Sequence, residues 1–256
     1  DEARELAAGN PLSFLHVSRA EIDFPEETDP HADAVYGKAA ENFAALKDRA
    51  PLVLEDEPSL YVYRLRMGAH TQTGIAGCFS VDEYEADIIR KHERTRRDKE
   101  DDRTRHIIEL RAQTGPVFLI HSASSDVAAV VARATGAAAA GVGHVAGPSP
   151  LCDFTAVDGV QHTIWRVDGK DQRELVAAFA AMPALYIADG HHRAASAARA
   201  RQYFRGAAGA AGEWDTFMAV AFPSDQAQIL AYNRVVKDLR GQTPDSLLAA
   251  LRQRVT

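Results

Sequence analysis

The sequence predicts a mixed α/β or α+β protein, and three patterns lead to this fold class. Residues 60–81 alternate with a period of two around a glycine-containing turn, which is typical of a β-hairpin. Residues 153–167 contain an Asp-Gly turn between two β-rich runs, which predicts a second hairpin. Residues 184–188 form a short apolar run, and a turn and an alanine-rich segment follow at once, which predicts strand, tight turn and helix. Because hairpins alternate with helices, these patterns favour a mixed sheet over a regular doubly wound one.

The length of 256 residues fits a single large mixed α/β domain over residues 1–256, with a phosphate-binding core around residues 184–240. The chain begins at Asp1 without a methionine, and residues 1–9 have the pattern of the end of a helix. We therefore expect the chain to be a portion of a longer protein, so catalytic groups can lie outside it.

Charge and composition exclude several classes of partner. The net charge is −7, and the chain has no polybasic run, which argues against binding to nucleic acid or to a membrane surface. No apolar stretch approaches the ~20 residues that cross a bilayer. The two cysteines, Cys78 and Cys152, lie far apart and outside any CxxC motif, which predicts a reduced, cytoplasmic protein. The sequence carries no signal for an oligomeric state.

The remaining expected elements follow from apolar spacing and from capping residues. In the first half we expect a strand at Leu12–Val17, a helix from Asp29-Pro30 with an apolar face from Val35 to Leu46, a helix from Asp82 that carries Ile88 and Ile89, and a helix that starts at Arg103. In the second half we expect a strand at Pro116–His121, a helix at Ala128–Ala140, a loop at Gly141–Pro150, a helix at Gln172–Met182, a linker at Gly206–Gly212, strands at Phe217–Phe222 and Ile229–Val236, and a last helix capped by Thr243 or Asp245.

The turn at Gly190 carries the most chemical information in the chain. Glycine lets the backbone turn sharply and approach a ligand closely, and the first amides of the following helix have no acceptor within the helix. Such a helix start suits an anion, and a phosphate fits there. Asp189 can cap the helix or hold a metal, His191 and His192 can act as acids or bases, and Arg193 can fork onto phosphate oxygens. The plainer alternative is an ordinary connection with an aspartate cap and two surface histidines.

A charged stretch between residues 91 and 105 supplies further candidates. Glu93 is a candidate general base or metal ligand, and Arg94 and Arg103 are candidate clamps for phosphate or carboxylate groups. The alternative for such a run is a solvated turn between two helices. His121 ends a predicted buried strand, a position at which a histidine is more often structural than a ligand. The chain contains no Walker A loop, GxGxxG, HExxH or GxSxG motif, so any nucleotide binds without a P-loop.

Several stretches also carry a family resemblance. The segment DGHHR, Asp189 to Arg193, resembles the signature of the ParB/sulfiredoxin superfamily, in which a turn at a helix start holds nucleotide phosphates, and its form is similar to that of archaeal-type free serine kinases. The wider chain is identified as a member of a bacterial family that is described as a domain of unknown function and is often labelled ParB-like or SpoOJ-like. The matching stretches are NPLSFLHVSRAEID (10–23), KHERTRRDKEDDR (91–103), TGPVFLIH (114–121), ADGHHRAASA (188–197) and YNRVVKDL (232–239).

The resemblance implies a ParB/sulfiredoxin-like nucleotide-binding core and a small-molecule phosphotransferase of the free-serine-kinase type. ADP or ATP with Mg²⁺ would then bind at the DGHHR turn, and the acceptor would be a small hydroxyl compound. Asp189 and a histidine would steer Mg²⁺ or the phosphoryl group, and Glu93 or a base outside this chain would remove the hydroxyl proton. The resemblance further implicates Arg94, Thr95, Arg103, Asn233 and Arg234 in phosphate or ligand contacts.

Three other functions remain open from the sequence. A ParB-like nucleotide-binding switch, with CTP as its nucleotide, would need a basic DNA-reading module, which this acidic chain lacks. A sulfiredoxin-type reductase would need a thiol at the position that His191 occupies. The third alternative is a protein that binds a nucleotide without turning it over. The sequence does not identify the acceptor, and it does not show that Glu93, Arg103 and Arg234 meet the turn in space.

Overall fold

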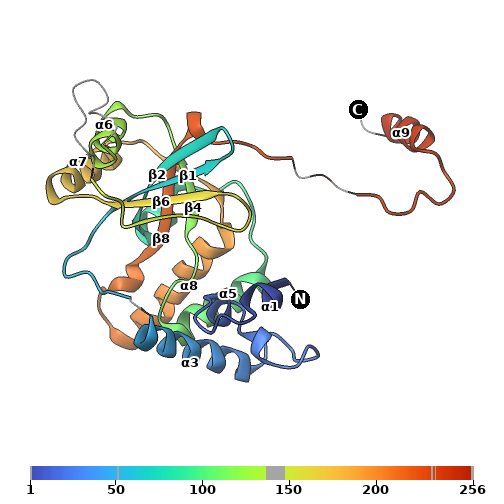
Figure 1. Cartoon of the computed structure of the whole chain (residues 1–256), viewed down its shortest axis with the longest axis horizontal. Helices are drawn as coiled ribbons and strands as arrows, with labels where there is room; N and C mark the ends of the chain where they lie inside the picture. The colour runs from blue at the N-terminus through green and yellow to red at the C-terminus, as the bar shows by residue number, and fades with distance from the viewer. Residues whose placement is uncertain (1, 51, 137–147, 232, 234, 255–256) are drawn as a thin grey trace.

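The structure is a computed structural model, and it describes residues 2–50, 52–136, 148–231, 233 and 235–254. Its centre is an eight-stranded mixed sheet in the order β3-β7-β4-β8-β2-β1-β6-β5 (Figure 1). The strands are β1 (Tyr61–Met67), β2 (His70–Ser80), β3 (Ile89–Arg90), β4 (Val117–His121), β5 (Cys152–Thr155), β6 (Gln161–Arg166), β7 (Leu185–Asp189) and β8 (Thr216–Pro223). The α+β class that the sequence predicts is therefore confirmed.

The pairing of the strands combines local hairpins with long-range contacts. Strands β1 and β2 form an antiparallel hairpin, and so do β5 and β6. By contrast, β4 pairs in parallel with β8, and β3 pairs in parallel with β7. Strand β7 also pairs antiparallel with β4, which places the end of β7 near the start of β4. Both predicted hairpins are confirmed, and the long-range pairs position the turn that follows β7.

Helices surround the sheet and also form a separate layer at one end of the molecule (Figure 1). The α-helices are α1 (Glu2–Ala7), α2 (Leu15–Ser18), α3 (Asp33–Arg49), α4 (Val81–Glu85), α5 (Arg97–Leu110), α6 (Ser125–Ala134), α7 (Gly169–Ala180), α8 (His191–Ala208) and α9 (Pro244–Arg252). The short 3₁₀ helices are η1 (Ala20–Asp23), η3 (Glu213–Asp215) and η4 (Ser224–Gln226).

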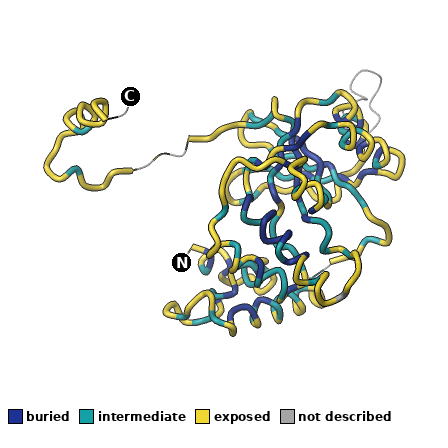
Figure 2. Tube along the Cα trace, turned by 180° about the vertical axis from the view of Figure 1, so that it is seen from behind, coloured by how far each residue is buried: buried dark blue, intermediate teal, exposed yellow. Residues whose placement is uncertain are grey.

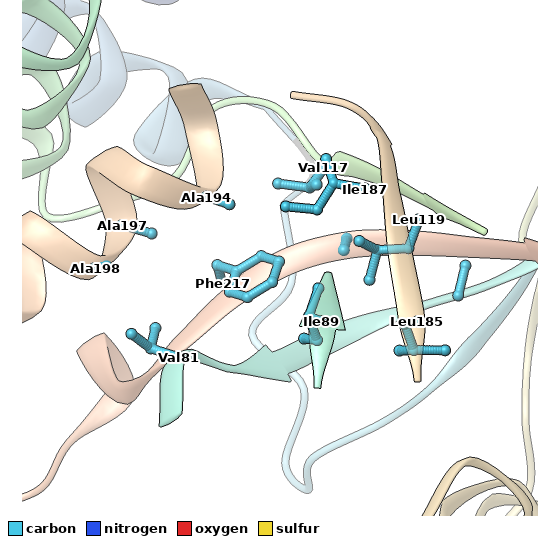
Figure 3. Close-up of a cluster of buried hydrophobic side chains, with 12 residues drawn as sticks. Val81, Ile89, Val117, Leu119, Leu185, Ile187, Ala194, Ala197, Ala198 and Phe217 are labelled. Atoms are coloured by element: carbon cyan, nitrogen blue, oxygen red, sulfur yellow. The ribbon is translucent and has the colours of Figure 1, made fainter. Parts of the chain in front are cut away.

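Four apolar clusters of described residues hold these elements together, the smallest of them between α1 and η1, and Figure 2 shows the buried segments in dark blue. The first joins β4, β7 and β8 to the alanine-rich face of α8, with Phe217 and Ala194 among its members (Figure 3). The second packs α6 and α7 on β1, β2 and β6 around Val62. The third lies between α2, α3 and α5 around Val17. Helix α5 also packs along α8 and so joins the α3 layer to the body of the protein.

The structure corrects several predicted elements. The segment Leu12–Val17 is not a strand: it leads into α2, where Val17 is 1% exposed and packs on α3. Helix α4 ends at Glu85, a left-handed residue at Asp87 turns the chain, and Ile89 belongs to strand β3. Helix α5 begins at Arg97, six residues before the predicted start at Arg103.

Further corrections concern the second half of the chain. The predicted strand at 229–236 is absent among the described residues of that range: they are exposed and belong to no strand, and Ile229 is fully exposed on the segment that runs outward to α9 in Figure 1. Helix α8 continues to Ala208, into the predicted linker. Helix α6 ends at Ala134, and most of the predicted loop at Gly141–Pro150 lies outside the described residues. Within the part of the chain that is described, no helix is both long enough and apolar enough to span a membrane.

Candidate functional site

The turn between β7 and α8 has the conformation that its sequence predicts. Gly190 lies in the left-handed region at φ 93° and precedes the first residue of α8. A Cβ atom at this position would lie 3.4 Å from the Cα atom of Val117 and equally close to the guanidinium group of Arg193. Only glycine takes this backbone conformation without strain, and the first amides of α8 point out of the helix.

His191 is buried behind the turn, with 3% of its surface exposed. The backbone amide of His92 donates a hydrogen bond to its Nε2 atom at 3.4 Å, which leaves the imidazole proton on Nδ1. That Nδ1 atom lies 3.5 Å from a carboxylate oxygen of Glu93. Burial, and next the neighbouring His92, lower the pKa of His191, while Glu93 and Asp189 act in the opposite direction. The neutral imidazole is therefore the form that this environment favours.

His192 also binds the loop at residues 92–96 through a main-chain amide. Its Nε2 atom accepts a hydrogen bond from the backbone amide of Arg96 at 3.0 Å. The two adjacent histidines thus hold residues 92–96 against the start of α8 through two main-chain amides. This geometry gives both histidines a structural task, and their predicted catalytic role stays a prediction.

Arg193 belongs to the other side of the turn. Its guanidinium donates to the carbonyl oxygen of Pro116 and to the carboxylate of Asp189, the latter at 2.8 Å. Its side chain also passes the backbone of Gly115 and reaches a cavity between α8 and the helical layer. Arg193 therefore connects the turn at Gly190 with this cavity, whose walls carry several further charged side chains.

This cavity has a volume of about 550 Å³, within the range of small-molecule sites. Its walls come from η1, the start of α3, one face of α5, the loop before β4 and Arg193. The lining residues are Ser18, Arg19, Ala20, Glu21, Pro30, His31, Val35, Tyr36, Ala39, Lys99, Asp102, Arg103, His106, Ile107, Gln113, Thr114, Gly115 and Arg193. Four cationic side chains face two carboxylates here, so a chain with a net charge of −7 concentrates positive charge at this place.

The two carboxylates of the cavity are held differently. Glu21 accepts a hydrogen bond from Arg19 at 2.5 Å, so its charge is locally balanced. Asp102 accepts a hydrogen bond from the hydroxyl of Tyr36 at 2.6 Å, and the Nδ1 atom of His31 lies 3.2 Å from the same oxygen. Burial and then the contact with Asp102 raise the pKa of the Tyr36 hydroxyl, which keeps it a donor. A carboxylate that orients an imidazole at a cavity wall is a common arrangement for a general base.

The cavity brings together some of the predicted site residues and not others. Arg193 and Arg103 both line it, as the phosphate-clamp hypothesis requires. Glu93, Arg94 and Thr95 lie on the loop next to the histidines and do not line it. Asn233 is exposed and does not line the cavity. Arg234 lies outside the described residues.

Several lining residues are absent from the sequence-based candidates, although the sequence contains a signal for some of them. Lys99, Asp102 and His106 were not candidates, yet together with the predicted Arg103 they follow the spacing i, i+3, i+4, i+7, which places the four on one face of a helix. Recognising that stripe would have required the correct start of α5. Glu21, His31 and Tyr36 come from distant segments and carry no comparable pattern.

The structure does not support a metal site built by the protein alone. Among the described residues, no group of three or more His, Cys, Asp or Glu side chains is placed to hold a metal ion. Asp189, the predicted metal ligand, forms an ion pair with Arg193, and its role as a metal ligand stays a prediction. Magnesium is commonly bound through one or two carboxylates together with substrate phosphates, so a Mg²⁺ ion at this site would have to arrive with the nucleotide.

Comparison with known proteins assigns the whole chain to one family model. The model described as "Protein of unknown function (DUF1015)" matches residues 1–256. The expected membership of a ParB-like or SpoOJ-like family is therefore wrong, because the matching model is a different one. Neither the curated proteins nor the solved structures contain a match, so the predicted ParB/sulfiredoxin-like core is not confirmed.

Proposed function

The chain belongs to the DUF1015 family of proteins of unknown function, and we propose that it is a small-molecule phosphotransferase whose nucleotide binds in the cavity beside α8. The observation that carries this proposal is the meeting of Arg193, at the start of α8, with Arg103 and Lys99 on α5. Phosphoryl transfer depends mainly on positioning and on neutralising charge. A cavity with several cations next to a helix start offers both.

The free energy of nucleotide binding would come from the helix N-terminus and the cationic side chains together. A helix N-terminus stabilises an anion by only ~0.3–1 kcal/mol, and by up to ~2 kcal/mol in favourable geometry. Micromolar binding corresponds to about 8 kcal/mol. Hydrogen bonds to charged groups contribute about 1.5–3 kcal/mol each, so two or three guanidinium or ammonium groups supply most of the difference. Lys99 and Arg103 have no carboxylate within ion-pair distance among the described residues, which leaves both available to a ligand.

The Asp102–His31 pair is the best-placed base for removing a proton from the acceptor hydroxyl. Asp102 orients the imidazole through Nδ1, and the Nε2 atom of His31 is then the proton acceptor. Glu93 is not a lining residue, so we assign proton removal to this pair instead. The acceptor in this proposal is a small hydroxyl compound such as free serine, and the donor is ADP or ATP carrying its own Mg²⁺.

A thermal-shift and turnover experiment tests the proposal. The full-length protein is heated with ADP, ATP or CTP, with and without Mg²⁺, and phosphorylated products are sought with free serine and other small hydroxyl compounds. We expect ADP or ATP to raise the melting temperature, and Arg193→Ala and Arg103→Ala to remove that shift. Arg173→Ala, which removes an exposed arginine of α7 outside the cavity, is the matched control.

The outcomes separate the alternatives. If no nucleotide changes the melting temperature at millimolar concentration, the phosphate-binding cavity is refuted. A shift that depends on Arg193 without any product from a wide panel of acceptors would indicate a nucleotide-binding protein that does not catalyse transfer. A shift that survives both cavity substitutions would place the nucleotide elsewhere.

A further inference from the structure

A second cavity lies on the sheet, at a distance in sequence from every residue of the α8 turn. It has a volume of about 630 Å³ and is walled by β1, β2, β5, β6 and η4. Its lining residues are Arg64, Arg66, Thr71, Thr73, Asp153, Gln161, Thr163, Trp165 and Gln226. None of them lines the cavity beside α8.

The strand register explains why these side chains form one surface. Arg64 lies opposite Thr73 of β2 and Thr163 of β6, so the three share one face of the sheet. Arg66 lies two residues further on, opposite Thr71 and Gln161, and forms the next polar row. On the same face of the sheet, the row next to Arg64 on its N-terminal side is apolar. Val62 and Trp165 form this row, which is buried under α6 and α7. The polar rows therefore begin where the helical cover of the sheet ends.

The two arginines of this cavity contact uncharged side chains. Arg64 is half-buried: its Nε atom donates to the Thr73 hydroxyl at 3.3 Å, and its guanidinium lies 4.8 Å from the ring centre of Trp165. Arg66 donates through Nε to the side chain of Gln161 at 2.9 Å. Within the described part of the chain, neither guanidinium has an acidic partner at ion-pair distance. Burial without such a partner lowers the pKa of Arg64.

The one acidic residue of the cavity is already engaged. An oxygen of Asp153 accepts hydrogen bonds from Gln161 at 2.7 Å and from the Thr163 hydroxyl at 3.2 Å. Gln226 closes one end of the cavity by accepting a hydrogen bond from the amide of Thr73. The surface thus offers two guanidinium forks and a row of threonine hydroxyls, a set that is rich in donors. A desolvated guanidinium is costly unless an anion accompanies it.

We propose that this sheet cavity is a second ligand site, at which Arg64 and Arg66 bind a small molecule through its oxyanion group. A phosphate or a carboxylate fits the planar fork of a guanidinium through two parallel hydrogen bonds. Residues two apart on a strand are about 7 Å apart, so one multivalent anion can contact both guanidinium groups. The site is independent of the phosphotransferase proposal, because it shares no residue with the α8 cavity.

Trp165 offers a direct signal for binding, because its ring lies against Arg64. The chain has two tryptophans, so Trp214→Phe leaves Trp165 as the single emitter in it, and phenylalanine can keep the stacking of residue 214 on Phe204. In that background, inorganic phosphate, pyrophosphate and citrate are titrated separately at constant ionic strength, with chloride as the balancing salt. We expect a saturable change in Trp165 fluorescence emission. The anion that binds with the highest affinity then shows whether the site prefers a phosphate or a carboxylate group.

Matched variants locate the signal. Arg64→Gln is expected to weaken the binding at least tenfold and Arg66→Gln at least threefold, whereas Arg173→Gln and Arg193→Ala leave it unchanged. Arg66 is exposed, so Arg66→Gln tests the site even if Arg64→Gln does not fold. A response that never saturates and equals that of chloride would overturn the proposal. So would an unchanged affinity in Arg66→Gln, or a loss of binding in Arg193→Ala.

Discussion

The two sides of the turn at Gly190 differ in what their side chains bind. On one side, His191 and His192 accept hydrogen bonds from the main-chain amides of the loop at residues 92–96. On the other side, Arg193 borders a cavity with further cations and the Asp102–His31 pair. Three consecutive residues of one motif thus divide between holding a loop and lining a cavity. The difference teaches that adjacent residues of one motif can have separate surroundings, so each predicted role needs a test of its own.

The largest expected effect is a loss of turnover in Asp102→Asn, on the cavity side of the turn. The amide keeps the shape and the acceptor for Tyr36 but loses the charge that stabilises a protonated His31, so turnover should fall roughly 10²–10⁴-fold. The melting temperature should change little, because asparagine retains the hydrogen bond. Steady-state formation of the phosphorylated product measures the effect. Asp98→Asn on the same helix, outside the cavity, serves as the control, and wild-type turnover in Asp102→Asn would remove this pair from the mechanism.

On the histidine side, His191→Ala should act on stability instead. Removing a buried side chain and leaving the amide of His92 without its acceptor should cost roughly 2–4 kcal/mol of unfolding free energy. His192→Ala, at a half-buried position, should cost about 1 kcal/mol. Urea denaturation measures both, and the nucleotide-induced shift of the folded protein should persist. If His191→Ala were as stable as the wild type yet unable to bind nucleotide, the contrast between the two sides would be wrong.

The pH dependence of stability sharpens the same contrast. Burial lowers the pKa of His191, and also that of His121, below the ordinary value of 6.5, so the folded state binds fewer protons than the unfolded chain. Stability is therefore complete above about pH 6.5 and declines as the pH falls through the lowered pKa values. His191→Gln, which cannot be protonated, should flatten this decline between neutral pH and the range where carboxylates titrate. Melting temperatures at closely spaced pH values check it, and a stability that rises on acidification would contradict the assignment.

Glu93→Gln should change stability and turnover the least of these substitutions. The carboxylate is largely exposed and lies 3.5 Å from His191, so its loss should change stability by less than ~1 kcal/mol at neutral pH. Because Glu93 favours the protonated imidazole, its removal lowers the pKa of His191 further and makes the acid decline slightly steeper. Turnover should stay near that of the wild type. A loss of turnover by a hundredfold or more would restore Glu93 as the base that the sequence suggested.

The sequence predicted well those elements whose local pattern has one physical solution. The first strand of the β1–β2 hairpin has a period of two and leads into a glycine-containing turn, and the step from β7 to α8 needs a glycine with positive φ, so both were recognisable. Short apolar runs were ambiguous: Leu12–Val17 suits a strand or a helix, and packing on α3 decides for the helix. Helix α5 was placed too late because its first turns are all charged and bear no apolar face.

The residues of the candidate site were only partly predictable, because many of them come from segments that are distant in sequence. Arg193 and Arg103 could be proposed because each sits at a recognisable helix start or charged run, and they do line one cavity. The remaining members come from the same face of α5 and from η1, α3 and the loop before β4, and only tertiary packing brings these elements together. No spacing in the chain connects Glu21 or Tyr36 with Arg193. Loop neighbours such as Glu93, close to the motif in space, proved to face His191 instead.

The parallel pairing of β4 with β8 has a consequence for how the protein reaches its native state. Val117 pairs with Ala219, so two segments about a hundred residues apart must meet before the sheet is continuous on both sides of β4. Closing such a long loop is entropically slow compared with forming the local hairpins. During synthesis, every residue around the α8 cavity leaves the ribosome before β8 does. We therefore expect the hairpins to form early, and the cavity to acquire its final shape only when the last strand of the sheet docks.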